Sequence, residues 1–475
     1  MNRIGVHMKK KFDWKLFLIF GGILLLAIFS FGFGYDYYWH VKAGEYMVHN
    51  LKIPYHDIFS WYGMSHNLYW MSHEWLSEVV IYLYKYIFKD LGPILFNISV
   101  YLILILVLFQ CNKKNLAKNK IFTFIWALIG ILVFSRVMLP RPHMISYILL
   151  AFTIYVLYDN FNNQDSKKIY FLPLISMLWA NFHGGSSNLP YILCILFLIS
   201  GLFKFKFGKI EANRITKNQI KKYIICGILS IITIVINPHG LKMLTYPYIN
   251  MGDSLMISNI TEWASPNLNN ISDYGDFLLL GVIIITMIIT KKKIKLVDFI
   301  ILGAFLVLGF KSLKFIALLY IVATFIVCNM VDEIKLEIPN KMAIAILITL
   351  IVSGGILTPR LINNYHKKVI PDEIIEYIKE KNPKRLFNYY GYGGYLIYND
   401  ILVFIDGRAD MYSKYNFKDA VDMQNMGYSY LIKGYDFDMI VIPNGISLGT
   451  HLLDNDDYNI TKQVDNVVIY EKIKA

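Results

Sequence analysis

The chain has 475 residues, of which 56% are hydrophobic and 17% charged, and its mean hydropathy is +0.45. This composition excludes a water-soluble globular protein, and the length exceeds that of a single membrane hairpin. The net charge of +13 does not indicate nucleic-acid binding, because Lys and Arg occur in short clusters between apolar runs, where they report membrane topology. We therefore expect a mainly α-helical polytopic membrane bundle.

A basic segment, Met1 to Lys15, leads directly into an apolar run with no small-residue cleavage site. This pattern predicts an uncleaved first span and a cytoplasmic N-terminus. The cysteines show no paired spacing, so neither a disulfide framework nor a cysteine metal site is expected. They are Cys111, Cys194, Cys226 and Cys328.

About eleven apolar runs are long enough to cross a hydrocarbon core as helices. They lie at 16–34, 93–110, 121–135, 144–158, 170–182, 190–207, 223–237, 277–290, 296–310, 315–331 and 342–358. Lysine clusters occupy every second connection, around 113–120, 167–168, 204–222 and 291–295. The positive-inside rule places these connections in the cytoplasm and the intervening ones outside, as in a multi-pass protein of the plasma membrane.

The chain divides into a transmembrane part, residues 1–360, and a less hydrophobic part, residues 365–475, in which helix and strand patterns alternate. The second part is predicted to be a small extracytoplasmic α/β domain. Its expected elements are a helix at Asp372–Lys381 and strands at Leu402–Ile405, Met439–Ile442 and Val467–Tyr470.

Glycine patterns do not indicate nucleotide binding. The chain contains no Walker A pattern and no GxGxxG motif, which argues against ATP-driven transport within this chain. The glycines of the run Gly391 to Gly394 are expected to permit a tight turn.

The first outer loop, residues 35–92, is long and rich in aromatic and ionisable residues. Within it, Tyr37–His49 and Leu76–Phe88 are predicted to be helices that lie along the outer membrane surface. Counting the second as a span would reverse the charge rule in every later connection.

Asp36 follows the first span by one or two residues, so its carboxylate is expected where the apolar slab meets water. Partial desolvation at that depth raises a carboxyl pKa, which suits a general base or a metal ligand. The alternative is that Asp36 and its tyrosine neighbours anchor the helix end in the interface.

Two His-carboxylate dipeptides, His56-Asp57 and His73-Glu74, lie in the same loop. Adjacent helical residues point about a hundred degrees apart, so a metal site would need both segments to converge with Asp36 or His40. A divalent cation is the cofactor that such a set would hold, at Asp36, His40, His73 and Glu74. The alternative is a polar loop whose histidines hydrogen-bond its own backbone.

Three tryptophans of this loop, Trp39, Trp70 and Trp75, are candidates to stack on sugar rings. Each one alone is equally typical of the aromatic belt at a membrane interface.

Cations on the outer side are notable because the charge rule disfavours them there. They flank one span end and occupy a turn between two late spans, where they would hold a lipid phosphate or diphosphate. The alternative is that they are snorkelling anchors. These residues are Arg136, Arg141, His143, Lys311 and Lys314.

The whole arrangement resembles the GT-C superfamily of membrane glycosyltransferases, which use polyprenyl-phosphate-linked sugars, and within it a subset of bacterial proteins. The shared features are an acidic residue after the first span, a long first outer loop, about eleven spans, a basic residue near a late span, and an outward C-terminal domain. The residues that carry the likeness are Tyr38–Gly44, Pro54–Ser60, His73–Leu76, Trp179–Gly185, Asn237–Gly240, Glu262–Pro266, Phe387–Ile397 and Phe404–Asp410.

The resemblance implies roles for individual residues. In the superfamily the carboxylate after the first helix is the base or a metal-site residue, which corresponds to Asp36. Basic residues near a late span bind the lipid phosphate, which corresponds to Lys311 or Lys314. Relatives more often carry arginine there, and lysine supports only a point-charge contact.

We therefore expect an inverting glycosyltransferase that moves a sugar from a polyprenyl-phosphate carrier to an envelope glycan, lipid or protein at the outer membrane face. Asp36 would activate the acceptor, with Glu74 or Asp57 assisting, and His40 and His73 complete the candidate catalytic set. A transporter or flippase for lipid-linked glycans is the first alternative, although the predicted spans contain almost no charge. A non-catalytic envelope-assembly protein on the same scaffold is the second. In the exported domain, Arg408 and its aspartate neighbours are expected to close a turn.

Overall fold

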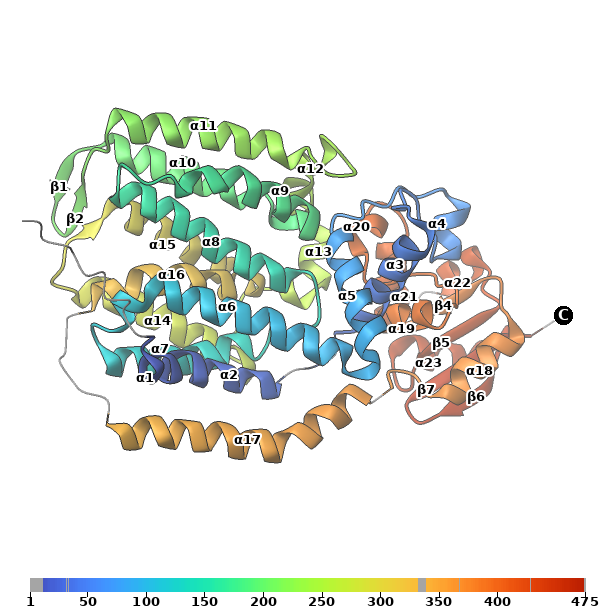
Figure 1. Cartoon of the computed structure of the whole chain (residues 1–475). Helices are drawn as coiled ribbons and strands as arrows, with labels where there is room; N and C mark the ends of the chain where they lie inside the picture. Colours follow the sequence, from blue (N-terminus) through green and yellow to red (C-terminus); the bar gives the residue numbers. More distant parts are fainter. Residues whose placement is uncertain are drawn as a thin grey trace, which may run out of the picture.

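The structure is a computed structural model that describes residues 12–473 apart from 31, 33, 332–338, 367 and 428. Figure 1 shows a bundle of long helices with a mixed α/β domain at one end, which we call the domain end. The basic segment 1–11, predicted to be cytoplasmic, lies outside the described residues.

Each predicted apolar run contains a helix, but the run 190–207 is helical only to Leu202 and its last residues, 205–207, form a strand. The first run comprises α1 (Trp14–Phe17), a π-helical turn (Leu18–Gly22), α2 (Ile23–Leu25) and a 3₁₀ turn (Leu26–Ser30). The others form α6 (Gly92–Leu116), α7 (Lys120–Phe134), α8 (His143–Asn162), α9 (Leu172–Phe182), α10 (Leu189–Leu202), α11 (Lys217–Ile234), α14 (Tyr274–Ile289), α15 (Leu296–Lys311), α16 (Ile316–Met330) and α17 (Asn340–His366).

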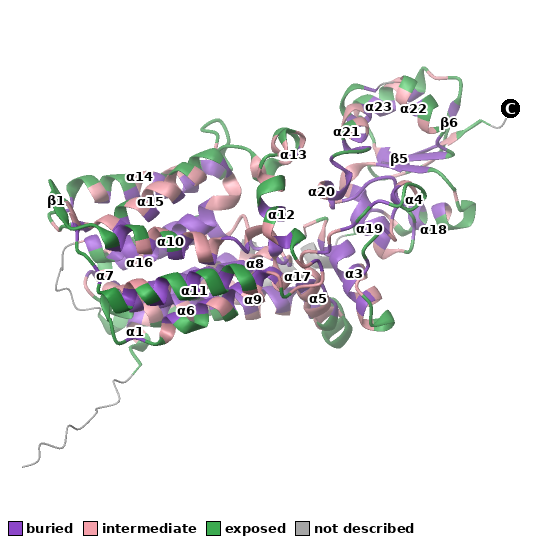
Figure 2. Ribbon diagram, turned by 90° about the horizontal axis from the view of Figure 1, so that it is seen from above, coloured by how far each residue is buried: buried purple, intermediate pink, exposed green. Residues whose placement is uncertain are grey.

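Within the described residues, six helical segments are long and apolar enough to cross a membrane, namely Trp75–Leu116, His143–Asn162, Gly184–Leu202, Ile271–Ile289, Leu313–Met330 and Asn340–Leu357. Two shorter apolar helices are Trp14–Phe29 and Lys120–Phe134. Figure 2 shows exposed residues along the outer helices α11 and α14, and many residues of these helices that are exposed are apolar. In α17 only 6% of the apolar window is buried. Such a surface requires lipid to cover it. The chain is a membrane protein, and about eleven crossings stays a prediction.

Two lysine-rich connections meet at the end of the bundle opposite the C-terminal domain. There β1 (Phe205–Phe207) pairs antiparallel with β2 (Ile210–Ala212), and β2 pairs parallel with β3 (Ile294–Lys295). Figure 1 shows β1 and β2 far from the α/β domain. The connections around 204–222 and 291–295 therefore share one end, as the alternation of lysine clusters requires. The sheet itself was not predicted.

The connection between α2 and α6, which we call the first connection, folds at the domain end. Both predicted helices are present, as α3 (Tyr37–Asn50) and α5 (Trp75–Phe88), with the short α4 (Trp61–Ser65) between them. They pack closely because Gly44 of α3 has no side chain; a Cβ there would lie 2.1 Å from the carbonyl oxygen of Glu78. After α5, a 3₁₀ turn at Lys89–Leu91 leads directly into α6.

The C-terminal domain holds a four-stranded sheet in the order β4-β5-β7-β6. β4 is parallel to β5, and the other neighbours are antiparallel. Two predicted strands, β5 and β7, and the helix α18 are confirmed. The elements are α18 (Asp372–Lys381), β4 (Leu386–Asn388), α19 (Gly393–Tyr398), α20 (Ala409–Tyr412), α21 (Phe417–Met426), α22 (Ser429–Tyr435), β5 (Met439–Pro443), α23 (Ser447–Leu453), β6 (Tyr458–Val464) and β7 (Val467–Lys472).

The strand predicted at Leu402–Ile405 is wrong. This segment is extended, but it makes only an isolated bridge from Val403 to Ser60 of the first connection. The Trp61 N–H donates to the Val403 carbonyl at 3.0 Å, and the Val403 N–H donates to the Phe59 carbonyl at 3.2 Å. Its backbone groups therefore join the domain to the first connection instead of extending the sheet.

The glycine run 391–394 does more than form a turn. Gly391 lies in a 3₁₀ turn, whereas Gly393 and Gly394 begin α19. A Cβ on Gly393 would lie 2.3 Å from the Ile405 carbonyl oxygen, and one on Gly394 would lie 2.5 Å from the Tyr35 carbonyl oxygen. These glycines permit a close approach between the domain and the start of the first connection.

Arg408 joins the domain to the first connection through a buried ion network. Its guanidinium bonds Asp406 Oδ2 at 2.6 Å and Asp57 Oδ1 at 2.7 Å, and all three side chains are at most 1% exposed. The same guanidinium lies 4.6 Å from the ring centroid of Trp70. The predicted pairing of Arg408 with a neighbouring aspartate is present, as the bond to Asp406. The additional bond to Asp57 connects the C-terminal domain to the first connection.

Replacing Arg408 by methionine (R408M) would leave the buried carboxylates of Asp57 and Asp406 without their cation. We expect the free energy of unfolding to fall by about 3–5 kcal/mol, because an unpaired buried charge keeps its full desolvation cost. Thermal unfolding and limited proteolysis of the full chain in detergent measure this change.

The matched control is R385M, because Arg385 is half exposed and bonds the half-exposed Asp436. Loss of a surface pair should change stability by less than about 1 kcal/mol. Equal effects of the two variants would contradict the role given to Arg408.

Candidate functional site

An ion triad lies where the first connection begins, just before α3. Asp36 Oδ2 accepts a hydrogen bond from Arg141 Nη2 at 2.6 Å, and Arg141 Nη1 bonds Glu262. The side chains of Asp36 and Arg141 are 20% and 21% exposed, and that of Glu262 is 52% exposed. The triad therefore joins three separate segments and is partly exposed.

The C-terminal domain closes over Asp36. A Cβ on Gly407 would lie 1.8 Å from Asp36 Oδ1 and 2.8 Å from Trp39 Nε1. Only a glycine at position 407 leaves room for the Asp36 carboxylate. The segment 406–408 therefore contacts the triad through Gly407 and forms the buried ion network through Asp406 and Arg408.

Burial raises the pKa of Asp36 above its ordinary value, although the Arg141 guanidinium opposes the shift. Burial alone would lower the pKa of Arg141, but Glu262 and Asp36 outweigh it and raise the pKa, so Arg141 stays charged. The carboxyl of Glu262 has its pKa lowered, chiefly by Arg141. Asp36 is thus the carboxyl of the triad whose burial favours taking a proton.

Beside the triad, Glu74 lies at the centre of a group of histidines. Its Oε1 is 3.4 Å from His73 Nε2 and 3.2 Å from His183 Nε2, and its Oε2 is 3.9 Å from His40 Nδ1. His40 Nδ1 is also 3.4 Å from Oε1 of Glu78, one α-helical turn further along the chain. His40, His73 and Glu74 therefore lie together, whereas Asp57 of the other dipeptide bonds Arg408.

The histidines differ in protonation. Burial lowers the pKa of His40 to about 3 and that of His183 to about 3, so both rings are neutral at pH 7. Burial also opposes protonation of His73, but the carboxylates of Glu74 and Asp410 outweigh it and raise the pKa to about 9. Glu74 is buried too, and the charge of His73 holds its pKa well below the usual range.

The connection between α9 and α10 places His183. Its Nδ1 is 2.7 Å from Ser146 Oγ, and Trp179 Nε1 donates to the same hydroxyl at 2.9 Å. This contact turns the opposite ring nitrogen toward Glu74. The Gly184 N–H donates to the His73 carbonyl at 2.9 Å, which fixes the segment on the first connection.

Asp410 of the C-terminal domain reaches the same group through Tyr246 of α12 (Lys242–Met251). The Tyr246 hydroxyl donates to Asp410 Oδ2 at 2.8 Å and lies 2.8 Å from His73 Nδ1. The domain therefore contributes both Gly407 and Asp410 to the site.

Several predicted site residues lie elsewhere. Asp57 belongs to the buried Arg408 network. Arg136 bonds the carboxylates of Asp273 and Asp276 at the start of α14, so its charge is already compensated.

The predicted sugar-stacking tryptophans are mostly enclosed. Trp39 and Trp70 are 5% and 2% exposed, and their rings pack on His40 and Arg408. Neither offers a free ring face to a sugar, because the domain and the first connection bury them. Trp75 is half-buried, and its Nε1 donates to Asn181.

The remaining predicted cations border the site. His143 donates from Nε2 to the Val137 carbonyl at 2.9 Å. Lys314 is half-buried, with its Nζ 2.8 Å from the ring centroid of Trp263, the residue after Glu262. Lys311 is exposed at the end of α15.

Five contributors were not among the predicted site residues, although four lie in or beside segments that carried the family resemblance. Glu78 stands one helical turn after Glu74, and that i, i+4 spacing was a usable signal. Tyr246 had no signal, because its contact depends on how distant segments pack. The five are Glu78, His183, Tyr246, Glu262 and Asp410.

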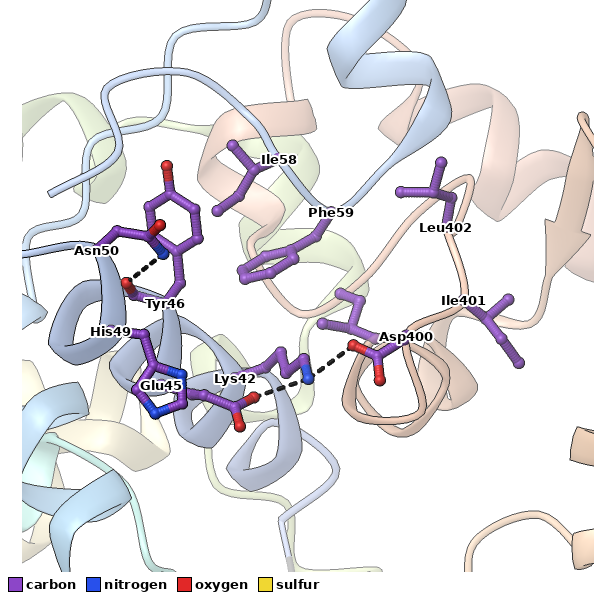
Figure 3. A pocket seen from close by; sticks show the side chains of 11 residues that line it. Lys42, Glu45, Tyr46, His49, Asn50, Ile58, Phe59, Asp400, Ile401 and Leu402 are labelled. Atoms are coloured by element: carbon purple, nitrogen blue, oxygen red, sulfur yellow. Dashed lines mark hydrogen bonds and ion pairs between the residues drawn. The ribbon is translucent and has the colours of Figure 1, made fainter. Parts of the chain in front are cut away.

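A cavity of about 470 Å³ lies on another side of α3, between the first connection and the C-terminal domain (Figure 3). There Lys42 bridges Glu45 and Asp400, at 2.7 Å from each. No residue of the triad or the histidine group lines this cavity. The cavity is therefore separate from the junction around Asp36 and Glu74.

Replacing Gly44 by alanine (G44A) should separate α3 from α5, because the new methyl group would meet the backbone of Glu78. We expect the free energy of unfolding to fall by about 1–3 kcal/mol, the usual cost of overpacking. G303A on α15 is the control, since nothing lies within 4 Å of a Cβ there. A thermal midpoint in detergent that falls equally in both variants would contradict the close contact.

No family model matches the chain, and no curated protein matches its sequence. Archaeal oligosaccharyltransferase AglB from Archaeoglobus fulgidus, solved in complex with an inhibitory peptide and a dolichol-phosphate, aligns with 91% of this chain and 69% of its own, at a TM-score of 0.56 and 9% identity. The apo oligosaccharyltransferase of Archaeoglobus fulgidus aligns with 91% and 70%, at a TM-score of 0.50 and 11% identity. At such identities the likeness concerns the fold. The chain is a membrane protein with the GT-C fold of membrane glycosyltransferases.

Proposed function

We propose that this protein is a glycosyltransferase that moves a sugar from a polyprenyl-phosphate carrier to a cell-envelope acceptor, with inversion at the anomeric carbon. The observation that carries the proposal is the partly exposed Asp36–Arg141 ion pair at the start of α3, in the connection that follows the first helix of a GT-C fold. A carboxylate and a guanidinium side by side provide a proton acceptor and a phosphate ligand.

In the proposed reaction, the acceptor hydroxyl oxygen bonds to the anomeric carbon while the bond from that carbon to the phosphate oxygen breaks. Asp36 takes the hydroxyl proton, and the lipid phosphate leaves with the electron pair. Burial favours proton uptake by Asp36.

Negative charge builds up on the departing phosphate, and fixed cations at that point lower the barrier. Arg141 presents two guanidinium nitrogens that Asp36 and Glu262 hold in place. Lys314 supports the same charge from the neighbouring turn, beside the Trp263 ring. Of the five predicted phosphate ligands, Arg141 and Lys314 are the two that we propose to stabilise the departing phosphate.

The donor class follows from the proposed orientation. With the lysine-rich end in the cytoplasm, the site faces outward, where nucleotide sugars are absent and a lipid-linked donor is required. The archaeal oligosaccharyltransferase with a similar fold binds a dolichol-phosphate and an inhibitory peptide in its solved complex. Here the proposed acceptor is an envelope glycan, lipid or protein, and the proposed location is the plasma membrane.

Replacing Asp36 by asparagine (D36N) preserves the side-chain shape and removes the proton acceptor. We expect transfer to fall by about 10²–10⁴-fold, the range over which a general base contributes. The assay follows transfer from a polyprenyl-phosphate-linked sugar to envelope acceptors by the purified full chain in liposomes.

E45Q is the matched control, because Glu45 lies on α3 and bonds Lys42 away from the triad. It should leave the rate within a few-fold of the wild type. Undiminished transfer by a correctly inserted D36N protein would overturn the assignment of the base, and the scaffold alternative would gain if neither wild type nor variant transferred sugar.

The dependence of the rate on pH gives a second test. Asp36 must be ionised to accept a proton, and its pKa is raised from the ordinary 3.8, so transfer should fall on acidification at a pH above 3.8. The charge of Arg141 lowers that pKa, so R141Q should move the fall to higher pH. A measured kcat/KM profile that moves to lower pH in R141Q would contradict the pairing.

A further inference from the structure

Among the described residues, one group of three brings potential metal-ligand atoms together, namely His40, Glu74 and Glu78, whose donor atoms all lie within 4.8 Å of one another. His40 Nδ1 is 3.4 Å from Glu78 Oε1 and 3.9 Å from Glu74 Oε2. Atoms bound at about 2.1 Å to one ion lie about 3–4 Å apart, so these separations suit a shared cation better than direct hydrogen bonds.

The two carboxyl groups can each offer an oxygen to a cation, beside the protonated His73 that pairs with Glu74. Two carboxylates are buried together, with side chains 12% and 1% exposed. Among the described residues, the ion-pair partners of Glu74 and Glu78 are histidines, with no Lys or Arg within 4.0 Å. The Arg408 guanidinium acts on Glu78 only from a distance and is already bonded to Asp57 and Asp406.

The surrounding residues hold the three donors in place. Ser72 Oγ donates to Glu78 Oε2 at 3.1 Å and leaves Oε1 directed at His40. The ring of His40 stacks on Trp39, with centroids 3.7 Å apart. Gly44 lets α3 approach the backbone of Glu78. Such outer contacts orient ligands in protein metal sites.

We propose that His40, Glu74 and Glu78 form a binding site for one divalent transition-metal ion, of which Zn²⁺ is the best match. One imidazole nitrogen and two carboxylate oxygens are a ligand set that Zn²⁺ accepts, and three protein ligands leave a coordination position open. The site is distinct from Asp36, whose carboxylate is paired with Arg141.

An ion at this position would join α3 to the start of α5. Glu74 is the most exposed of the three ligands and the neighbour of His73 and His183. The inference does not depend on the proposed transferase activity, because metal binding is measured on the protein itself.

The test measures bound metal per chain. The purified full chain in detergent is stripped with EDTA, dialysed against Zn²⁺ or, separately, Mn²⁺, and analysed by inductively coupled plasma mass spectrometry. We expect about one Zn²⁺ per wild-type chain and a loss of at least tenfold in Zn²⁺ affinity in H40Q and E78Q. H49Q and E45Q, which remove an imidazole and a carboxylate from the same helix α3 outside the group, should keep the ion, and so should D36N.

X-ray absorption at the zinc edge of the wild-type protein keeps the proposal testable if H40Q or E78Q fails to fold. We expect nitrogen and oxygen ligands with the scattering of a single imidazole. Fewer than about 0.1 Zn²⁺ per wild-type chain, retention of Zn²⁺ by folded H40Q and E78Q, or a spectrum with several imidazoles or with sulfur would each overturn the site. Loss of transfer by D36N with Zn²⁺ retained would separate this inference from the proposed function.

Discussion

Burying an ionised side chain costs several kcal/mol unless an opposite charge or hydrogen bonds replace the lost water. The junction between the helical bundle and the C-terminal domain is built on that constraint. Asp36, Asp57 and Asp410 each have a partner from a different part of the chain. The partners fix how the first connection and the domain sit on the bundle.

The same contacts create the site. Arg408 holds the domain against the first connection, which brings Gly407 over Asp36 and Asp410 beside Tyr246. The connection between α9 and α10 adds His183, and the segment before α14 adds Glu262. Because each part contributes one or two groups, the site exists only in the assembled fold. This explains why segments scattered over the chain meet within one small volume.

The sequence predicted what depends on local pattern. Apolar runs located the long helices of the bundle, and lysine clusters placed the connections around 204–222 and 291–295 at one end. Asp36, predicted as a site residue from its position after the first span, lies in the ion triad. The prediction failed where contacts between distant segments of the chain determine the local structure. Leu402–Ile405 has the composition of a buried strand, but its backbone bonds the first connection.

The sequence also could not predict which partners the charged side chains bind. Arg136 and Arg141 are five residues apart and equally cationic, yet one bonds the start of α14 and the other bonds Asp36. Trp70 was a candidate to stack on a sugar ring, but its ring packs against the Arg408 guanidinium. His183 and Asp410 lay in recognised segments, but only the packing of those segments shows which side chain enters the site.

Mass spectrometry of envelope glycans from cells that lack this protein, complemented with either the wild-type or the D36N chain, tests the central claim most directly. The account predicts that one sugar is missing from a defined envelope acceptor in the deletion strain, that the wild-type chain restores it, and that D36N, inserted at the same level, does not. Identical glycans in all three strains under every growth condition would contradict it.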